Sequence, residues 1–119
     1  MSWYKKSELD DMNKGGDCYE SAGRYFMDNY IKDSSLILVH GIVIGQGKIS
    51  GVKYGHAWIE RGDTVLDYSN GRNLELPKIL YYSLGNIDES KLFRYNGEKF
   101  ADRILEHETW GPWDLESEF

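Results

Sequence analysis

The chain has 119 residues and a formal net charge of −6, and 40% of its residues are hydrophobic. This length suffices for one hydrophobic core but not for two, so we predict a single domain over residues 1–119. The negative charge argues against nucleic acid or an anionic membrane as a partner, because binding to either relies on clustered positive charge.

Local features of the sequence argue against several other classes of protein. No apolar run approaches the roughly 20 residues of a membrane span, and the N-terminal residues lack the apolar centre of a secretory signal. We therefore expect a cytoplasmic protein. The single cysteine cannot form an internal disulfide, and no Cys/His group has the spacing of a zinc site. The acidic C-terminal stretch, with Asp114, Glu116 and Glu118, is typical of a solvated tail.

The first long element along the chain is a predicted helix at residues 17–30. Asp17 is a favourable N-cap, and apolar side chains then recur at helical spacing from Cys18 to Tyr30. Gly23 lies inside this helix, where it costs about 1 kcal/mol relative to Ala. Such a glycine indicates the close approach of another backbone, for which a strand is the candidate.

Short apolar runs rich in β-branched residues predict a small antiparallel sheet. We expect its strands at residues 36–45, 52–60, 64–69 and 91–95. The tight turn "RGD" joins the second and third strands as a hairpin. A helix is expected between Pro77 and Gly85, and a last helix after the N-cap Asn96, with an apolar side of Phe100, Ala101, Ile104 and Leu105.

This order of elements predicts an α+β fold: a small antiparallel sheet of three to five strands packed against the N-terminal helix that carries Cys18. The thiolate is the nucleophilic form of cysteine, and the unpaired N–H groups of a first helical turn favour an anion. The same turn, from Asp17 to Tyr19, offers donors for the negative oxygen of a tetrahedral intermediate, with Tyr54 and Asn13 as candidates for a second donor. A lone cysteine is also a common apolar core residue, so its position alone leaves both interpretations open.

The hairpin tests whether His56 and Asp67 can meet. A turn at Arg61-Gly62 places His56 directly across from Asp67, and a turn at Gly62-Asp63 places Asp67 opposite Trp58, diagonal to His56 on the same face. Only an odd loop length would send the two side chains to opposite faces. The sequence therefore favours an imidazole–carboxylate contact, with Trp58 as a candidate wall of the cleft.

The three stretches "GDCYESA", "GHAWIE" and "LDYSN" together resemble the transglutaminase-like branch of the papain-like cysteine enzymes. In that superfamily a Cys begins a helix, a His precedes Ala-Trp and an acid on a strand, and an Asp ends the next strand. The resemblance covers about residues 15–70. It implies a papain-like core in which Cys18 is the nucleophile, His56 the general base and acid, and Asp67 its orienting partner.

We therefore predict a cysteine-dependent hydrolase or acyltransferase that acts on an amide, thioester or ester of a small molecule, peptide or protein. This chemistry needs neither a metal nor an organic cofactor. The alternative is a catalytically inactive domain of the same fold that binds a small ligand or a partner protein.

Overall fold

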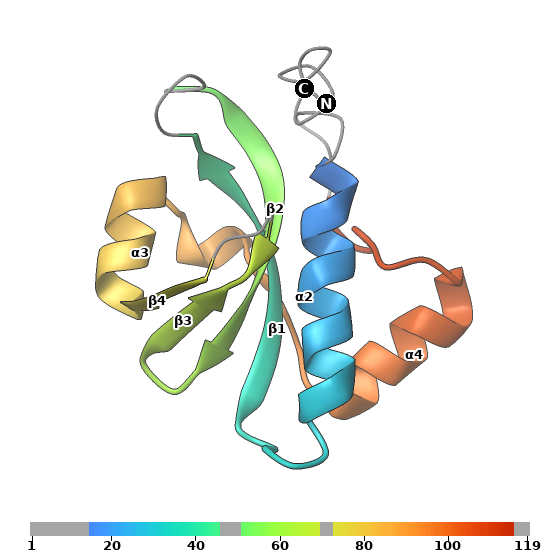
Figure 1. Ribbon diagram of the computed structural model, residues 1–119. Coiled ribbons are helices and arrows are strands. Elements are labelled where there is room, and N and C mark those ends of the chain that lie inside the picture. The colour runs from blue at the N-terminus through green and yellow to red at the C-terminus, as the bar shows by residue number, and fades with distance from the viewer. Residues whose placement is uncertain (1–14, 46–50, 70–72, 116–119) are drawn as a thin grey trace.

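The computed structural model describes residues 15–45, 51–69 and 73–115, which form an α+β fold (Figure 1). A five-stranded antiparallel sheet lies at its centre, with α2 and α4 on one side and α3 on the other. The described helices are α2 (Gly15–Asn29), α3 (Lys78–Gly85), α4 (Gly97–His107) and the short 3₁₀ helix η3 (Glu89–Lys91). The strands, in the spatial order β4-β3-β2-β1-β5, are β1 (Leu36–Ile44), β2 (Lys53–Arg61), β3 (Thr64–Asp67), β4 (Leu74–Pro77) and β5 (Phe93–Tyr95).

Helix α2 carries the predicted cysteine and packs its apolar stripe against the sheet. It begins at Gly15, so Asp17 lies inside its first turn and not at the N-cap. Gly23 is explained by a side chain and not by a strand, because a Cβ there would lie 2.5 Å from Cε3 of Trp110. The aromatic ring of Trp110 thus takes the place that a side chain at position 23 would fill.

The structure contains a strand that the sequence did not indicate. Strand β4 pairs with β3, with Leu66 opposite Glu75. Pro77 ends this edge strand, where a missing N–H is tolerated, and it occupies the N-cap of α3 and not the first helical position. Helix α3 ends at Gly85, the predicted stop, and its C-cap Asn86 has the left-handed φ of 49°.

The last helix matches its prediction in its cap but not along its whole apolar side. The side chain of Asn96 accepts a hydrogen bond from the backbone N–H of Lys99 at 2.9 Å, as expected for an N-cap. Phe100 is buried against α2, whereas Leu105 is 78% exposed and does not belong to the core. The apolar side of α4 is therefore narrower than the sequence suggested.

The sheet divides the hydrophobic core into two layers, which we call the α2-side core and the α3-side core. The α2-side core contains Cys18, Tyr19, Ala22, Phe26, Leu36, Leu38, Ala57, Ile59, Leu66, Tyr95 and Phe100. The α3-side core contains Val39, Val43, Trp58, Val65, Tyr81 and Tyr82. Successive residues of β2 alternate between these cores, because neighbouring side chains of a strand point to opposite faces.

The C-terminal acidic stretch is partly a structural anchor. The carboxylate of Asp114 accepts hydrogen bonds from the Tyr95 hydroxyl at 2.7 Å and from Arg103 Nε at 2.9 Å. Burial raises the pKa of Asp114, but these two donors outweigh it and hold the pKa below its usual range. The prediction of a solvated tail is therefore wrong for Asp114, while Glu116 and Glu118 lie outside the described residues.

Candidate active site

The register of the β2–β3 hairpin brings His56 and Asp67 together. The paired residues are Arg61↔Thr64, Glu60↔Val65 and Ile59↔Leu66. The turn therefore lies at Gly62-Asp63, and one further step of this register places Asp67 opposite Trp58 and diagonal to His56. His56 Nε2 lies 2.9 Å from Asp67 Oδ2, so the predicted imidazole–carboxylate contact is confirmed. Both side chains are buried.

Donors on His56, Tyr81 and Ser69 hold the carboxylate of Asp67 within the described part of the chain. Its Oδ2 accepts from His56 Nε2 and from the Tyr81 hydroxyl at 2.8 Å. Its Oδ1 accepts from the backbone N–H of Ser69 at 3.1 Å and from the Ser69 hydroxyl at 2.7 Å. Burial raises the pKa of Asp67, but the hydrogen bond and charge of His56 and the donors on Ser69 and Tyr81 hold it well below its usual range.

Cys18 acts on the same imidazole, because its hydrogen-bonding and its charge are among the causes that raise the pKa of His56. His56 Nε2 is bonded to Asp67, so Nδ1 is the ring nitrogen that remains for a further partner. Burial lowers the pKa of His56, but the hydrogen bonds to Asp67 and Cys18 and the charges of these groups outweigh burial and raise the pKa to about 9. These partners therefore favour the positively charged form of the ring.

The thiol and the ring belong to opposite sides of the sheet, near the place where the pairing of β3 with β2 ends. Cys18 belongs to the α2-side core, whereas His56 shares its strand face with Trp58 in the α3-side core. The described pairing of β3 with β2 ends at Ile59, so His56 lies beyond the last pair. Gly55 allows α2 to come close here, because the hydroxyl of Tyr19 occupies the place that a Cβ at residue 55 would fill.

The helix start changes the prediction for the oxyanion donors. In a helix that begins at Gly15, the regular pattern pairs the N–H of Tyr19 with the carbonyl of Gly15, four residues earlier. The backbone N–H of Tyr19 is therefore taken by the helix, and only the first turn supplies unpaired N–H groups. Asn13 and the side chain of Asp17 lie outside the described residues.

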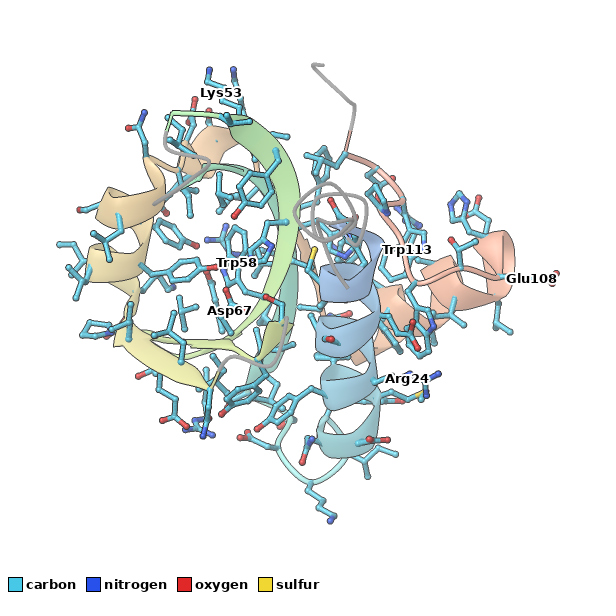
Figure 2. All side chains as sticks on the ribbon, turned by 45° about the horizontal axis from the view of Figure 1, so that its top comes forward. Arg24, Lys53, Trp58, Asp67, Glu108 and Trp113 are labelled. Atoms are coloured by element: carbon cyan, nitrogen blue, oxygen red, sulfur yellow. The ribbon has the colours of Figure 1, made fainter. Side chains whose placement is uncertain are left out.

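Two of the remaining predicted site residues, Trp58 and Tyr54, have rings close to that of His56. Trp58 is 0% exposed and its Nε1 donates to Glu60 Oε2 at 3.1 Å, and its expected role as a cleft wall stays a prediction. Figure 2 shows Trp58 on the side of the sheet that carries α3, opposite Trp113. The ring of Tyr54 meets that of His56 edge-on, with centroids 5.8 Å apart.

Sequence reasoning missed two partners of Asp67. Ser69 could have been found, because an Asp whose side chain bonds the N–H two residues later is a common turn motif and "DYS" has that spacing. Tyr81 gave no local signal. It reaches Asp67 only because β4 returns the chain along β3 before α3 begins, and that strand was not predicted.

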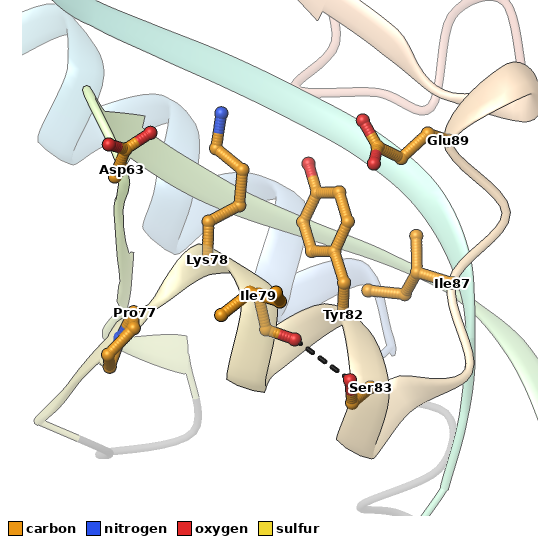
Figure 3. A pocket seen from close by; sticks show the side chains of 8 residues that line it. All are labelled: Asp63, Pro77, Lys78, Ile79, Tyr82, Ser83, Ile87 and Glu89. Carbon is orange, nitrogen blue, oxygen red and sulfur yellow. Dashed lines mark hydrogen bonds between the residues drawn. The ribbon is translucent and has the colours of Figure 1, made fainter.

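A cavity of about 570 Å³ lies beside α3 (Figure 3). Its lining residues are Asp63, Pro77, Lys78, Ile79, Tyr82, Ser83, Ile87 and Glu89. A second cavity, of about 320 Å³, is lined by residues of β1 and by the segment around Asp88. Neither of these cavities is lined by Cys18, His56 or Asp67.

Comparisons with known proteins add no family to this geometry. No protein-family model, no curated protein and no solved structure matches the chain. Within the described residues, no group of three His, Cys, Asp or Glu side chains is placed to hold a metal ion. Across the same residues, no helix combines the length and the apolar character that a membrane crossing requires.

Proposed function

We propose that the protein is a cysteine-dependent hydrolase or acyltransferase in which Cys18 attacks, His56 transfers protons and Asp67 orients His56. One observation carries this proposal. The imidazole of His56 is hydrogen-bonded to the Asp67 carboxylate at 2.9 Å, and Cys18 is close enough to raise the pKa of the same ring. An imidazolium beside the sulfur stabilises the thiolate, and a fixed carboxylate sets the orientation of the ring.

The reaction follows from these positions. The sulfur of Cys18 attacks the carbonyl carbon of an amide, thioester or ester, and the carbonyl π electrons move to oxygen. When the tetrahedral intermediate collapses, the bond to the leaving group breaks and His56 gives that group its proton. Water or an amine then attacks the thioester, its proton passes to His56, and the sulfur leaves as thiolate.

The arrangement of elements supports a papain-like, transglutaminase-like core as part of this proposal. A helix that carries the cysteine packs on an antiparallel sheet, and the histidine and the aspartate come from neighbouring strands, β2 and β3. The substrates that fit this proposal are small molecules, peptides or proteins with a reactive acyl group. The chemistry uses no metal and no organic cofactor.

A second candidate is a catalytically inactive domain of the same fold that binds a small ligand or a partner protein. The observation that favours it is burial, because Cys18 is 2% exposed and His56 is 4% exposed. A thiol at this depth meets a substrate only after the surrounding side chains move. Slow modification of Cys18 at every pH would favour this second candidate.

The test is the rate at which iodoacetamide modifies Cys18 at pH 6. A free thiol has a pKa of about 8.5 and is roughly 0.3% ionised at this pH. We expect fast modification in the native protein and a rate about a hundredfold lower in His56→Gln. His40→Gln, which removes the other buried imidazole, is the matched control and should leave the rate within about twofold.

A rate profile like that of a free thiol, unchanged in His56→Gln, would rule out the proposal. Intact-mass analysis with a panel of electrophilic amides and esters then addresses the substrate. We expect an acyl adduct with the native protein and none with Cys18→Ser.

A further inference from the structure

Helix α3 supplies two consecutive tyrosines whose hydroxyl groups each donate to a buried carboxylate. Tyr81 donates to Asp67 Oδ2 at 2.8 Å, and Tyr82 donates to Glu60 Oε2. Both rings are largely buried in the α3-side core. The two tyrosines therefore form a natural pair for comparison, since they share a helix, a chemical group and a type of acceptor.

The carboxylates of Glu60 and Asp67 differ in their other ionic and hydrogen-bond partners. Glu60 is surrounded by cations, with Lys78 Nζ at 3.5 Å and Arg94 Nε at 3.4 Å. Figure 3 shows the side chains of Lys78 and Tyr82 pointing the same way from α3. The Asp67 oxygen that receives Tyr81 also receives His56 Nε2 at 2.9 Å. Tyr81 and His56 thus share one acceptor atom.

Two donors on one carboxylate oxygen affect each other. The hydroxyl of Tyr81 neutralises part of the charge on Oδ2, so this oxygen draws the proton of His56 less strongly. Ser69 holds the opposite oxygen, Oδ1, through its N–H and its hydroxyl. With both oxygens bonded, the plane of the Asp67 carboxylate is fixed relative to the imidazole.

We propose that Tyr81 is a positioning residue of the Cys18–His56–Asp67 site, which fixes the Asp67 carboxylate and limits its pull on the imidazole so that the ring keeps its contact with the sulfur. The catalytic meaning of this role rests on the proposed function. The contact between Tyr81 and the imidazole–carboxylate pair does not, and it can be measured without turnover.

The groups that influence the charge of His56 come from every element around it. They are Cys18 on α2, Asp67 at the end of β3, Tyr81 on α3, Tyr54 on β2 and, on the other face, His40 on β1. Replacement of Tyr81 by Phe removes one donor from Asp67 and leaves the other ionisable groups in place. A change in the titration of His56 would then report on that donor.

The experiment compares Tyr81→Phe with Tyr82→Phe in the full chain. In Tyr81→Phe, Asp67 should draw the ring and its proton more strongly. We expect the NMR titration of His56 to move to higher pH, and iodoacetamide modification of Cys18 at pH 6 to slow about fivefold. Tyr82→Phe loses a comparable hydrogen bond. In this variant the NMR titration of His56 should stay at the native pH, and the rate of Cys18 modification should stay within about twofold of the native rate.

Equal effects of the two substitutions would overturn the proposal, because Tyr81 would then act only through packing. If Tyr81→Phe does not fold, the native protein supplies the second measurement. The hydroxyl proton of Tyr81 should exchange slowly and show a cross-peak to the Nε2 proton of His56, and exchange at the solvent rate would overturn the proposal. Failure of the proposed function has a different signature, in which His56→Gln leaves the reactivity of Cys18 unchanged while the effect of Tyr81→Phe on the His56 titration remains.

Discussion

The two sides of the sheet each bury one histidine, and the pKa values of the two histidines are shifted in opposite directions. His40 on β1 pairs with Ala57 and faces the α2-side core, while His56 on β2 pairs with Gly41 and faces the α3-side core. His40 is 0% exposed and His56 is 4% exposed. Their burial is therefore nearly equal, and a difference between them must come from their neighbours.

His40 lies among aromatic rings and has no polar contact for its nitrogens in the described part of the chain. The ring centroids of Tyr19 and Trp113 lie 4.9 Å from its own, and that of Tyr95 lies 5.0 Å away. Neither Nδ1 nor Nε2 has a hydrogen-bond partner there. Burial lowers the pKa of His40 to about 3, against an opposing effect of the Asp114 charge.

The partners of His56 reverse the effect of burial on its pKa. Burial alone would lower its pKa as it does for His40, yet Asp67 and Cys18 raise the pKa of His56 to about 9. The comparison teaches that burial alone does not set the pKa of a histidine. The donors and acceptors at its two nitrogens decide whether the ring is charged and therefore what chemistry it can take part in.

The largest expected effect is the difference in the free energy of unfolding between His56→Leu and His40→Leu. His56→Leu leaves the buried Asp67 without its cationic partner and should lower the free energy of unfolding by about 3–5 kcal/mol. His40→Leu removes an imidazole that makes no hydrogen bond and should raise the free energy of unfolding by about 1 kcal/mol at pH 7. Urea denaturation of both variants measures the two changes.

A similar loss of stability in both variants would contradict the comparison, because it would mean that His40 also makes a polar interaction worth keeping. A urea m-value close to that of the native protein is the control that the unfolded states are comparable.

The second prediction is a stability maximum near pH 6.5. The folded pKa of His56 is raised from 6.5 to about 9, so its contribution is fully present below pH 6.5 and is lost as pH rises through about 9. The folded pKa of His40 is lowered from 6.5 to about 3, so stability is also lost as pH falls below 6.5. At about 1.4 kcal/mol per pKa unit, the alkaline side can contribute up to about 3 kcal/mol and the acidic side up to about 5 kcal/mol.

Thermal or urea unfolding at pH 4 to 10 checks this profile. His40→Leu should flatten only the acidic side, and His56→Gln should flatten only the alkaline side. A profile that stays the same in both variants would show that other groups set the pH dependence.

A third prediction concerns the close packing of the α2 side. Gly23→Ala would place a Cβ 2.5 Å from Cε3 of Trp110 and should lower the free energy of unfolding by about 1–3 kcal/mol. In a Trp110→Ala background the same change should instead stabilise the helix by up to about 1 kcal/mol. A double-mutant cycle measures the coupling, and equal effects in both backgrounds would show that Trp110 is not the cause.

The sequence predicted those features that depend on local patterns. The hairpin is an example, because alternation along β2 and a two-residue turn limit the faces on which His56 and Asp67 can lie. The cap at Asn96 was predictable for the same reason, since a side-chain cap bonds within one turn.

Features that depend on distant segments could not be predicted. The four-residue strand β4 has no pattern of its own, because its stability comes from pairing with β3. Tyr81 reaches Asp67 through that unpredicted strand, and Trp110 fills the space at Gly23 from a segment after the last helix. Burial of Cys18 was also beyond local reasoning, because it depends on contacts from several elements.

The most direct test of the central claim is an NMR pH titration of the imidazole carbon-bound protons of His56 and His40. If a thiol and a carboxylate share the ring of His56, that ring should titrate at about 9, while the ring of His40 should titrate at about 3. A titration of His56 at or below 6.5 would contradict the account, because an imidazole without charged partners at this depth loses its proton easily.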